Sequence, residues 1–169
     1  MVDPAPKGAS IIAAIKAAGV DYVLSVPDVH TSFGLLWPIV NDPTLRLIRT
    51  CKEDECLGIA SGLAYADKRA LVLIQYTGLF YAMNAIRAVA VSLQQPICMM
   101  VGLLAKEPGV PPRQSRQQGI SSIEPILDAM GVDYHELETE ADVPLIAPAI
   151  KRAYETSRPV AILVGQSPT

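Results

Sequence analysis

Six short apolar runs recur along the chain, and segments with the apolar spacing of amphipathic helices lie between them. The apolar runs cover residues 21–26, 45–49, 70–75, 96–102, 132–137 and 159–165. The helical patterns cover residues 7–18, 31–37, 50–66, 77–90, 121–131 and 141–156. This alternation is typical of a parallel sheet with helices on both faces. The sequence therefore predicts one α/β domain over residues 1–169, a three-layer sandwich around a six-stranded, mainly parallel sheet.

The composition is apolar, because half of the residues are hydrophobic and only 18% are charged. A parallel sheet covered on both faces explains this, and so would burial of surface against another chain. The net charge of −3 and the lack of a Lys/Arg run argue against nucleic-acid binding. No apolar run reaches the length of a membrane span, and the first residues lack the apolar core of a signal peptide. We therefore expect a cytoplasmic protein with no membrane partner.

The cysteines and histidines do not predict a metal site. Cys51, Cys56 and Cys98 are odd in number and form no C-x-x-C pair, so we expect reduced thiols, with Cys51 and Cys56 packed in the fold. The two histidines, His30 and His135, lack the spacing of metal ligands. The chain also has no G-x-G-x-x-G, no Walker P-loop and no G-x-S-x-G motif. Ordinary dinucleotide binding and serine-hydrolase chemistry are therefore not supported.

The loops at the carboxyl ends of the predicted strands are the candidate binding loops, because ligands of parallel sheets bind there. They follow residues 26, 49, 75, 102 and 137. Three of these loops carry unusual residues: Asp28 with His30, then Glu53, then Thr77 with Gly78.

The helix that follows Glu53 is made largely of small residues, including Gly58 and Gly62. A glycine in a helix interior costs about 1 kcal/mol relative to alanine, so two of them indicate that something approaches this helix closely. The acids at its start, Glu53, Asp54 and Glu55, are favoured there by the helix dipole. Capping acids and packed small residues are therefore an alternative explanation that needs no ligand.

An ordered set of motifs extends over nearly the whole chain. The first motif is Lys52-Glu53 followed by G-I-A-S-G-x-A, which contains Gly62. The second is Val26-Pro27 at the end of the first predicted strand. The third is QYTGLFYAMNA, where the third predicted strand turns into the next helix. The set resembles the pyrimidine-binding domain of thiamine-diphosphate enzymes, in particular the alpha subunits of sulfopyruvate decarboxylase and the corresponding half of phosphonopyruvate decarboxylase. The resemblance implies the thiamine-diphosphate-binding fold.

The resemblance implies that Glu53 is the glutamate that hydrogen-bonds N1′ of the cofactor's aminopyrimidine, which favours loss of the C2 proton. Glu55 is an alternative, but the family spacing of nine residues between the glutamate and Gly62 selects Glu53. The resemblance also implies cofactor contacts from Pro27, Thr77, Gly78 and Asn84.

The chain lacks the Gly-Asp-Gly segment with a downstream Asn that could hold Mg²⁺ and a diphosphate. The resemblance therefore implies that thiamine diphosphate is shared with a diphosphate-binding beta subunit of similar size, which holds the Mg²⁺, in a higher hetero-oligomer. The active site would lie between the two chains, and the isolated chain would be inactive.

The resemblance implies decarboxylation of a short 2-oxo acid, sulfopyruvate or phosphonopyruvate, to the aldehyde and CO2. Similar decarboxylases read P-D-S after the first strand, whereas this chain reads Pro27-Asp28-Val29-His30. His30 would replace the serine as a donor or proton relay, or be a solvated or capping histidine. Arg113 and Arg116 in the loop 106–119 would hold the acidic tail of the substrate, or be ordinary exposed arginines. A carboligase subunit and a non-catalytic α/β regulatory subunit are the alternative functions.

Overall fold

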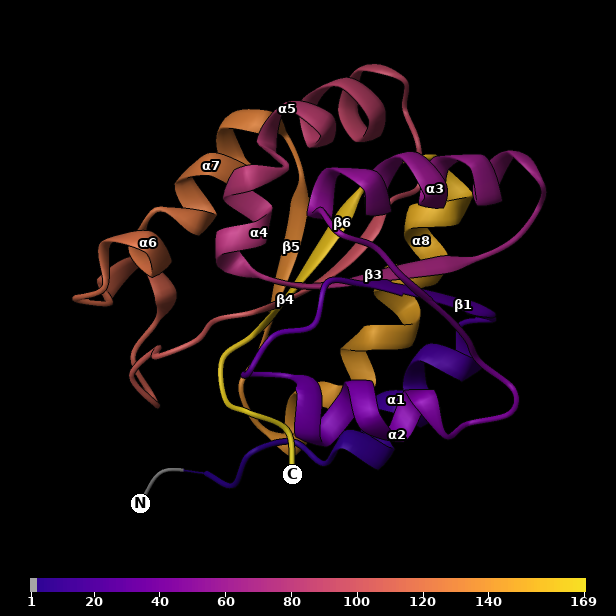
Figure 1. Ribbon diagram of the computed structural model, residues 1–169. Helices are drawn as coiled ribbons and strands as arrows, with labels where there is room; N and C mark the ends of the chain where they lie inside the picture. Colours follow the sequence, from indigo (N-terminus) through magenta and orange to yellow (C-terminus); the bar gives the residue numbers. More distant parts are fainter. Residues whose placement is uncertain (1–2) are drawn as a thin grey trace.

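The computed structural model describes residues 3–169 and shows an α/β fold in three layers (Figure 1). Every strand of its six-stranded sheet is parallel to its neighbours, in the order β2-β1-β3-β4-β6-β5. The strands are β1 (Tyr22–Ser25), β2 (Arg46–Arg49), β3 (Ala70–Gln75), β4 (Cys98–Gly102), β5 (Asp133–Leu137) and β6 (Val160–Val164). The predicted fold class is confirmed.

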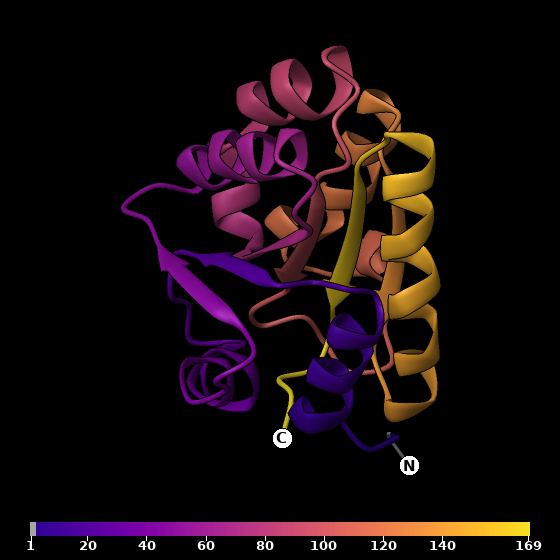
Figure 2. The ribbon, with the colours of Figure 1, turned by 90° about the vertical axis from the view of Figure 1, so that its right-hand side faces the viewer.

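Helices cover both faces of the sheet, as Figure 1 and Figure 2 show. One face carries α3 (Glu53–Tyr65), α4 (Tyr76–Tyr81), α5 (Met83–Ala85), the π-helical η2 (Ile86–Ser92), α6 (Gln118–Ser121) and α7 (Ile123–Met130). The other face carries α1 (Gly8–Ala17), the π-helical η1 (Ser32–Leu36), α2 (Trp37–Val40), the 3-10 segment η4 (Glu140–Leu145) and α8 (Ile146–Thr156). A further 3-10 turn, η3 (Pro112–Gln114), lies in the loop after β4.

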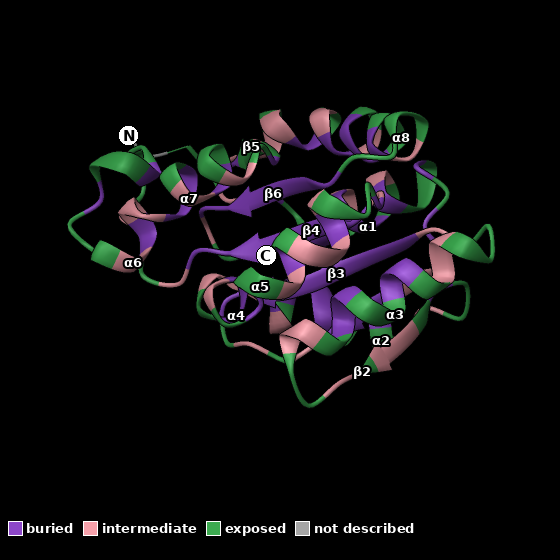
Figure 3. Ribbon diagram, turned by 90° about the horizontal axis from the view of Figure 1, so that it is seen from above, coloured by how far each residue is buried: buried purple, intermediate pink, exposed green. Residues whose placement is uncertain are grey.

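The sheet has a hydrophobic core on each face, which explains why its central strands are continuous apolar runs. In β3, Leu71 and Leu73 pack in the core beneath α1 and α8, whereas Val72 and Ile74 pack in the core beneath α3. β4 and β6 are buried along their whole length, and the edge strand β5 is largely exposed (Figure 3). The central strands thus form a rigid frame for the loops at their ends.

The chain changes face between β1 and β3. The link from β1 to β2 runs through η1 and α2 on one face, and the link from β2 to β3 runs through α3 on the other. Such a change of direction opens a crevice at the carboxyl ends of the strands, where ligands of open α/β sheets bind. The loops that contain His30, Glu53 and Gly78 leave β1, β2 and β3 at this edge.

The helix expected over residues 77–90 is broken into α4, α5 and the π-helical η2. The break keeps its apolar residues against the sheet, since Leu79, Ala82, Ile86 and Ala90 are all buried. Sequence periodicity predicted a helical segment here, but it does not separate α-helical from π-helical turns.

Pro38 lies where the helical segment after β1 changes from π-helical to α-helical turns. η1 ends at Leu36, and α2 begins at Trp37 with Pro38 at its second position. A proline is tolerated there because its missing N–H would have no partner within the helix.

The three cysteines are free in the structure. Cys56 and Cys98 are buried, but the expectation that Cys51 packs in the fold is wrong, because Cys51 lies in the exposed turn before α3. In the described part of the chain, no helix combines the length and the apolar character that a bilayer crossing requires.

Candidate active site

Glu53 is the first residue of α3, where the chain leaves β2 and turns back over the sheet. Lys52 before it is extended (φ −142°, ψ 148°), and three acids occupy the first helical turn, where the helix dipole favours negative charge. Glu53 is half-buried, and within residues 3–169 its carboxylate makes no hydrogen bond or ion pair, unlike its neighbours Asp54 and Glu55. This acid is therefore free to bind a ligand.

Gly78 in the first turns of α4 makes room for Glu53. A Cβ at position 78 would lie 2.5 Å from both Cγ and Oε1 of Glu53. These separations are far below a van der Waals contact, so any larger residue at position 78 would displace the carboxyl group. The tertiary structure thus joins two residues that lie after different strands.

Glu55, the alternative acid, has another partner. Its Oε2 accepts a hydrogen bond from the backbone N–H of Cys51 at 3.1 Å, which closes the turn before α3. The Asp54 carboxylate accepts from the N–H of Glu55 at 3.0 Å. Both carboxylates make hydrogen bonds at the start of the helix, as the structural explanation of the acids proposed, whereas the Glu53 carboxylate makes none among the described residues.

Thr77 and Asn84 lie on the segment that follows β3. Thr77 is exposed, and its hydroxyl donates to Oε1 of Gln75 at 2.9 Å. Asn84 is exposed on α5, and its Oδ1 accepts from Nη2 of Arg87 at 2.9 Å. Thr77 is next to Gly78, which contacts Glu53, while Asn84 lies farther along the same segment.

Pro27 is exposed at the end of β1 and opens a turn that Asp28 holds together. The Asp28 carboxylate accepts from the N–H groups of His30 (2.6 Å) and Thr31 (2.9 Å) and from the hydroxyl of Thr31 (2.6 Å). Three hydrogen bonds to one charged group fix the shape of this turn.

His30 is buried, with 6% of its surface exposed. Its Nε2 lies 3.0 Å from the carbonyl oxygen of Val164, and its Nδ1 lies 3.2 Å from the hydroxyl oxygen of Ser167. Burial lowers the pKa of His30, although the hydrogen bond to Val164 and the charges of Asp28 and Glu138 oppose this. The interpretation as a solvated histidine is wrong, because the ring lies between the β1 turn and the C-terminal residues. Its role as a donor or proton relay to substrate stays a prediction.

The structure separates the two loop arginines. Arg113 Nε lies 2.8 Å from the carboxylate of Glu124, and its Nη2 pairs with Asp128, so this side chain is attached to α7 near the β5 edge. Glu53, in contrast, follows β2 at the other edge of the sheet. Arg116 is 89% exposed in its side chain and lies 3.4 Å from Glu107.

A buried ion pair that sequence reasoning missed anchors the same loop. The Lys106 side chain is 2% exposed, and its Nζ lies 2.8 Å from Oε2 of Glu138. The other oxygen of Glu138 accepts from the N–H of Gly109 at 3.1 Å. Glu107 accepts from the Ser115 hydroxyl at 2.6 Å, which lowers the pKa of Glu107 to about 2. No local sequence pattern marks the Lys106–Glu138 ion pair, because its two residues are 32 positions apart.

The small-residue side of α3 has no neighbour within the described chain. A Cβ added at Gly58 or Gly62 would have no atom within 4 Å. Large apolar side chains lie exposed on α3 and on the helices next to it: Ile59, Tyr65, Tyr81, Met83 and Leu93. We call this set, with the two glycines, the α3 surface. No contact among residues 3–169 explains why α3 has two glycines.

The residues present fit the pyrimidine end of thiamine diphosphate. A carboxyl group with no partner among the described residues suits a ring nitrogen that exchanges a proton. The lack of a side chain at Gly78 leaves the space that the Glu53 carboxyl group occupies. Among residues 3–169, no group of histidine, cysteine, aspartate or glutamate side chains could hold a metal ion.

Comparisons with known proteins found a matching family and several named relatives. Residues 7–119 match the family described as thiamine pyrophosphate enzyme, N-terminal TPP binding domain. The chain is 29% identical to a sulfopyruvate decarboxylase of Methanosarcina acetivorans over 98% of this chain and 41% of that protein. It is 28% identical to the sulfopyruvate decarboxylase subunit alpha of Methanocaldococcus jannaschii over 91% of this chain and 90% of that subunit. It thus spans less than half of the first relative and nearly all of the second.

Proposed function

The chain belongs to the thiamine pyrophosphate enzyme family by its N-terminal TPP binding domain, and from this we propose that it is the pyrimidine-binding subunit of a thiamine-diphosphate-dependent 2-oxo acid decarboxylase. The names of the relatives support sulfopyruvate as substrate, with phosphonopyruvate as the second candidate. The observation that carries the proposal is the carboxylate of Glu53, which has no hydrogen-bond or ion-pair partner among the described residues and lies against Gly78.

Glu53 holds a proton at N1′ of the bound aminopyrimidine. When bound, thiamine diphosphate supplies the nucleophilic carbon and the electron sink that decarboxylation of a 2-oxo acid needs. Enclosure of Glu53 between two chains excludes water, so the carboxyl group exchanges a proton with the ring nitrogen rather than with solvent. Pro27, Thr77 and Gly78 line the same edge and contact the ring, and Asn84 contacts the cofactor from farther along that segment.

A second chain completes the site. We place the diphosphate and its Mg²⁺ on a beta subunit of similar size, because this chain has neither the Gly-Asp-Gly segment nor a metal-binding group among its described residues. The α3 surface is where that subunit packs, since a Cβ added at either of its glycines would meet no atom within 4 Å among the described residues and its large apolar side chains are exposed. The subunits assemble into a higher hetero-oligomer in the cytoplasm.

Arg116 receives the acidic tail of the substrate. Its side chain is 89% exposed and has one long contact at 3.4 Å, so it can turn toward an anion at small cost. Arg113 was expected to share this role, but its ion pairs with Glu124 and Asp128 make it the weaker candidate. A sulfonate and a phosphonate both suit a guanidinium group, so this contact alone does not select between them.

The experiment is the Glu53→Gln variant in the complex with the beta subunit, with sulfopyruvate as substrate. We expect a loss of turnover of about 10²–10⁴-fold, the usual contribution of a positioned proton-transfer group, with assembly unchanged. Glu55→Gln is the matched control, because it removes an acid two positions away that caps the helix, and its turnover stays near that of the wild type.

Unchanged turnover in Glu53→Gln would contradict the proposal and favour a non-catalytic regulatory subunit. Added aldehyde separates decarboxylation from the carboligase alternative. A decarboxylase releases the free aldehyde in its presence, whereas a carboligase yields the coupled product instead.

A further inference from the structure

The last five residues form a strap across the carboxyl edge of the sheet. This C-terminal strap, residues 165–169, leaves β6 and ends beside α1 (Figure 2). The N–H of Gly165 donates to the carbonyl of Leu137 at 3.0 Å, and the N–H of Thr169 donates to the carbonyl of Pro6 at 3.1 Å. The N–H of Gly8 donates to the carbonyl of Thr169 at 2.9 Å. Both ends of the strap are therefore fixed to neighbouring elements.

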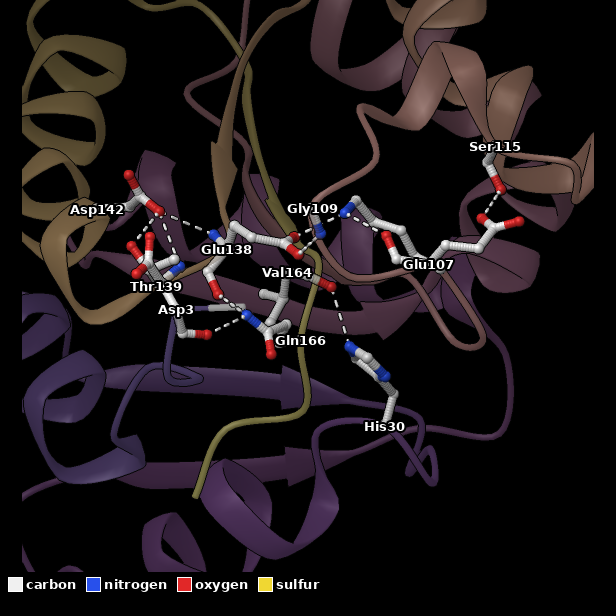
Figure 4. Close-up of polar contacts among 11 residues, drawn as sticks. Asp3, His30, Glu107, Gly109, Ser115, Glu138, Thr139, Asp142, Val164 and Gln166 are labelled. Carbon is white, nitrogen blue, oxygen red and sulfur yellow. Dashed lines mark hydrogen bonds and ion pairs between the residues drawn. The ribbon is translucent and has the colours of Figure 1, made fainter. Parts of the chain in front are cut away.

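The middle of the strap is equally well held. The side-chain amide of Gln166 donates to the carbonyl oxygens of Glu138 at 3.0 Å and Asp3 at 3.2 Å, as Figure 4 shows. Gly34 lies so close to Pro168 that a Cβ there would collide with the Pro168 carbonyl group. The glycine in η1 is thus the reason that the strap can lie on this segment.

The ring of His30 joins the strap to the turn after β1. Its Nε2 lies 3.0 Å from the carbonyl oxygen of Val164, which can only accept, so Nε2 carries the hydrogen. Nδ1 of the neutral ring then accepts from the hydroxyl of Ser167 at 3.2 Å. A Cβ at Gly102 would lie 3.0 Å from Cδ2 of the ring, so β4 closes the ring's remaining side. Both ring nitrogens are used within the protein.

The same residue is rigidly connected to the turn that begins at Pro27. The Asp28 carboxylate accepts from the backbone N–H of His30 at 2.6 Å, so the residue that carries the ring is itself part of this turn. The turn leaves β1, which lies between β2 and β3 in the sheet. It therefore lies between the strand ends that lead to Glu53 and to Gly78.

We propose that His30 is a positioning residue, whose neutral ring fastens the C-terminal strap to the Pro27–Asp28 turn and thereby holds this turn beside Glu53. The effect on the cofactor rests on the proposed function, whereas the fastening of the strap does not. Both hydrogen-bonding positions of the ring are filled, which distinguishes this role from a proton relay to the substrate.

Two measurements on His30→Ala and His30→Gln test the proposal. Glutamine can keep a donor near the Nε2 position, whereas alanine cannot. In the reconstituted complex, His30→Ala weakens thiamine diphosphate binding about tenfold, the size expected for one lost buried hydrogen bond, and His30→Gln stays within about threefold of the wild type. Amide hydrogen exchange in residues 165–169 becomes faster in His30→Ala and stays near wild type in His30→Gln. His135→Ala, at an exposed histidine on β5, is the control and changes neither quantity.

Each other outcome decides against the proposal. If His30→Gln loses as much turnover as His30→Ala although amide exchange in its strap stays slow, His30 is a proton relay and the positioning role is wrong. Unchanged exchange in His30→Ala also overturns it. If His30→Ala does not fold, Ser167→Ala takes its place, since it removes only the bond to Nδ1 and should still speed exchange in the strap. The exchange result stands even if the complex proves to have no thiamine-dependent activity, so a failure of the proposed function is recognised separately.

Discussion

The carboxyl group of Glu53 occupies the space that a side chain at Gly78 would need. A Cβ at Gly78 would come within 2.5 Å of Glu53 Oε1, although the two residues belong to different helices and follow different strands. The position of the proposed proton donor thus depends on the absence of a side chain on the neighbouring segment.

Replacing Gly78 with alanine tests this dependence. We expect turnover in the complex to fall by at least about tenfold, because the added methyl group displaces Glu53, while the helix itself tolerates alanine. Kinetics of Gly78→Ala, Glu53→Gln and the double variant measure it. If displacement of Glu53 is the cause, Gly78→Ala adds little in the Glu53→Gln background, and fully additive losses would show an independent effect.

Substitutions at Gly62 test the α3 surface. Gly62→Ala should stabilise the isolated chain by about 1 kcal/mol, because it removes a helical glycine where a Cβ has no neighbour within the chain. Gly62→Leu should leave the isolated chain folded but block assembly with the beta subunit, since the partner needs a close approach. Thermal unfolding and size-exclusion chromatography measure the two effects.

The control for that experiment is Ala129→Leu, at an exposed position on α7 away from the α3 surface. It should assemble normally. Normal assembly of Gly62→Leu would show that the beta subunit binds elsewhere.

The purified chain alone should have no decarboxylase activity and should bind thiamine diphosphate weakly. It supplies the pyrimidine edge of the proposed site but no Mg²⁺ ligands among its described residues. Calorimetric titration with thiamine diphosphate and Mg²⁺, with and without the beta subunit, measures this. Robust turnover by the chain alone would contradict the two-chain site.

The pKa shift of His30 predicts a loss of stability in weak acid. Burial lowers the pKa of His30 in the folded state below its ordinary value of 6.5, so the unfolded chain binds more protons as the pH falls through that value. The free energy of unfolding should therefore decrease below about pH 6.5 and be insensitive to His30 above it. Thermal unfolding from about pH 8 to about pH 5.5 should show a steeper loss in the wild type than in His30→Gln. Parallel curves would exclude His30 as the cause.

The two loop arginines should differ in their effects. Arg113→Ala leaves the buried carboxylate of Glu124 without its partner, so we expect a lower unfolding temperature and a KM for sulfopyruvate near that of the wild type. Arg116→Ala should leave the unfolding temperature nearly unchanged and raise KM about tenfold, the effect of one lost charged contact. The opposite assignment of effects would move the substrate contact to Arg113.

Much of the fold was predictable from sequence. The apolar runs and helical spacings gave the parallel sandwich because burial on two faces imposes local patterns. The family spacing of nine residues before Gly62 makes Glu53, rather than Glu55, the candidate acid, and this choice stays a prediction. Such relationships depend on residues that are neighbours along the chain.

Only the tertiary structure decided what each of these residues contacts. His30 meets Val164, Arg113 meets Glu124, and Lys106 meets Glu138 across long stretches of chain, so no local pattern determines these pairs. The split of the segment 77–90 into α-helical and π-helical turns likewise depends on fitting its apolar residues to the sheet. Local chemistry selects which side chains are present, whereas close packing of distant segments determines which of them are left free to bind a ligand.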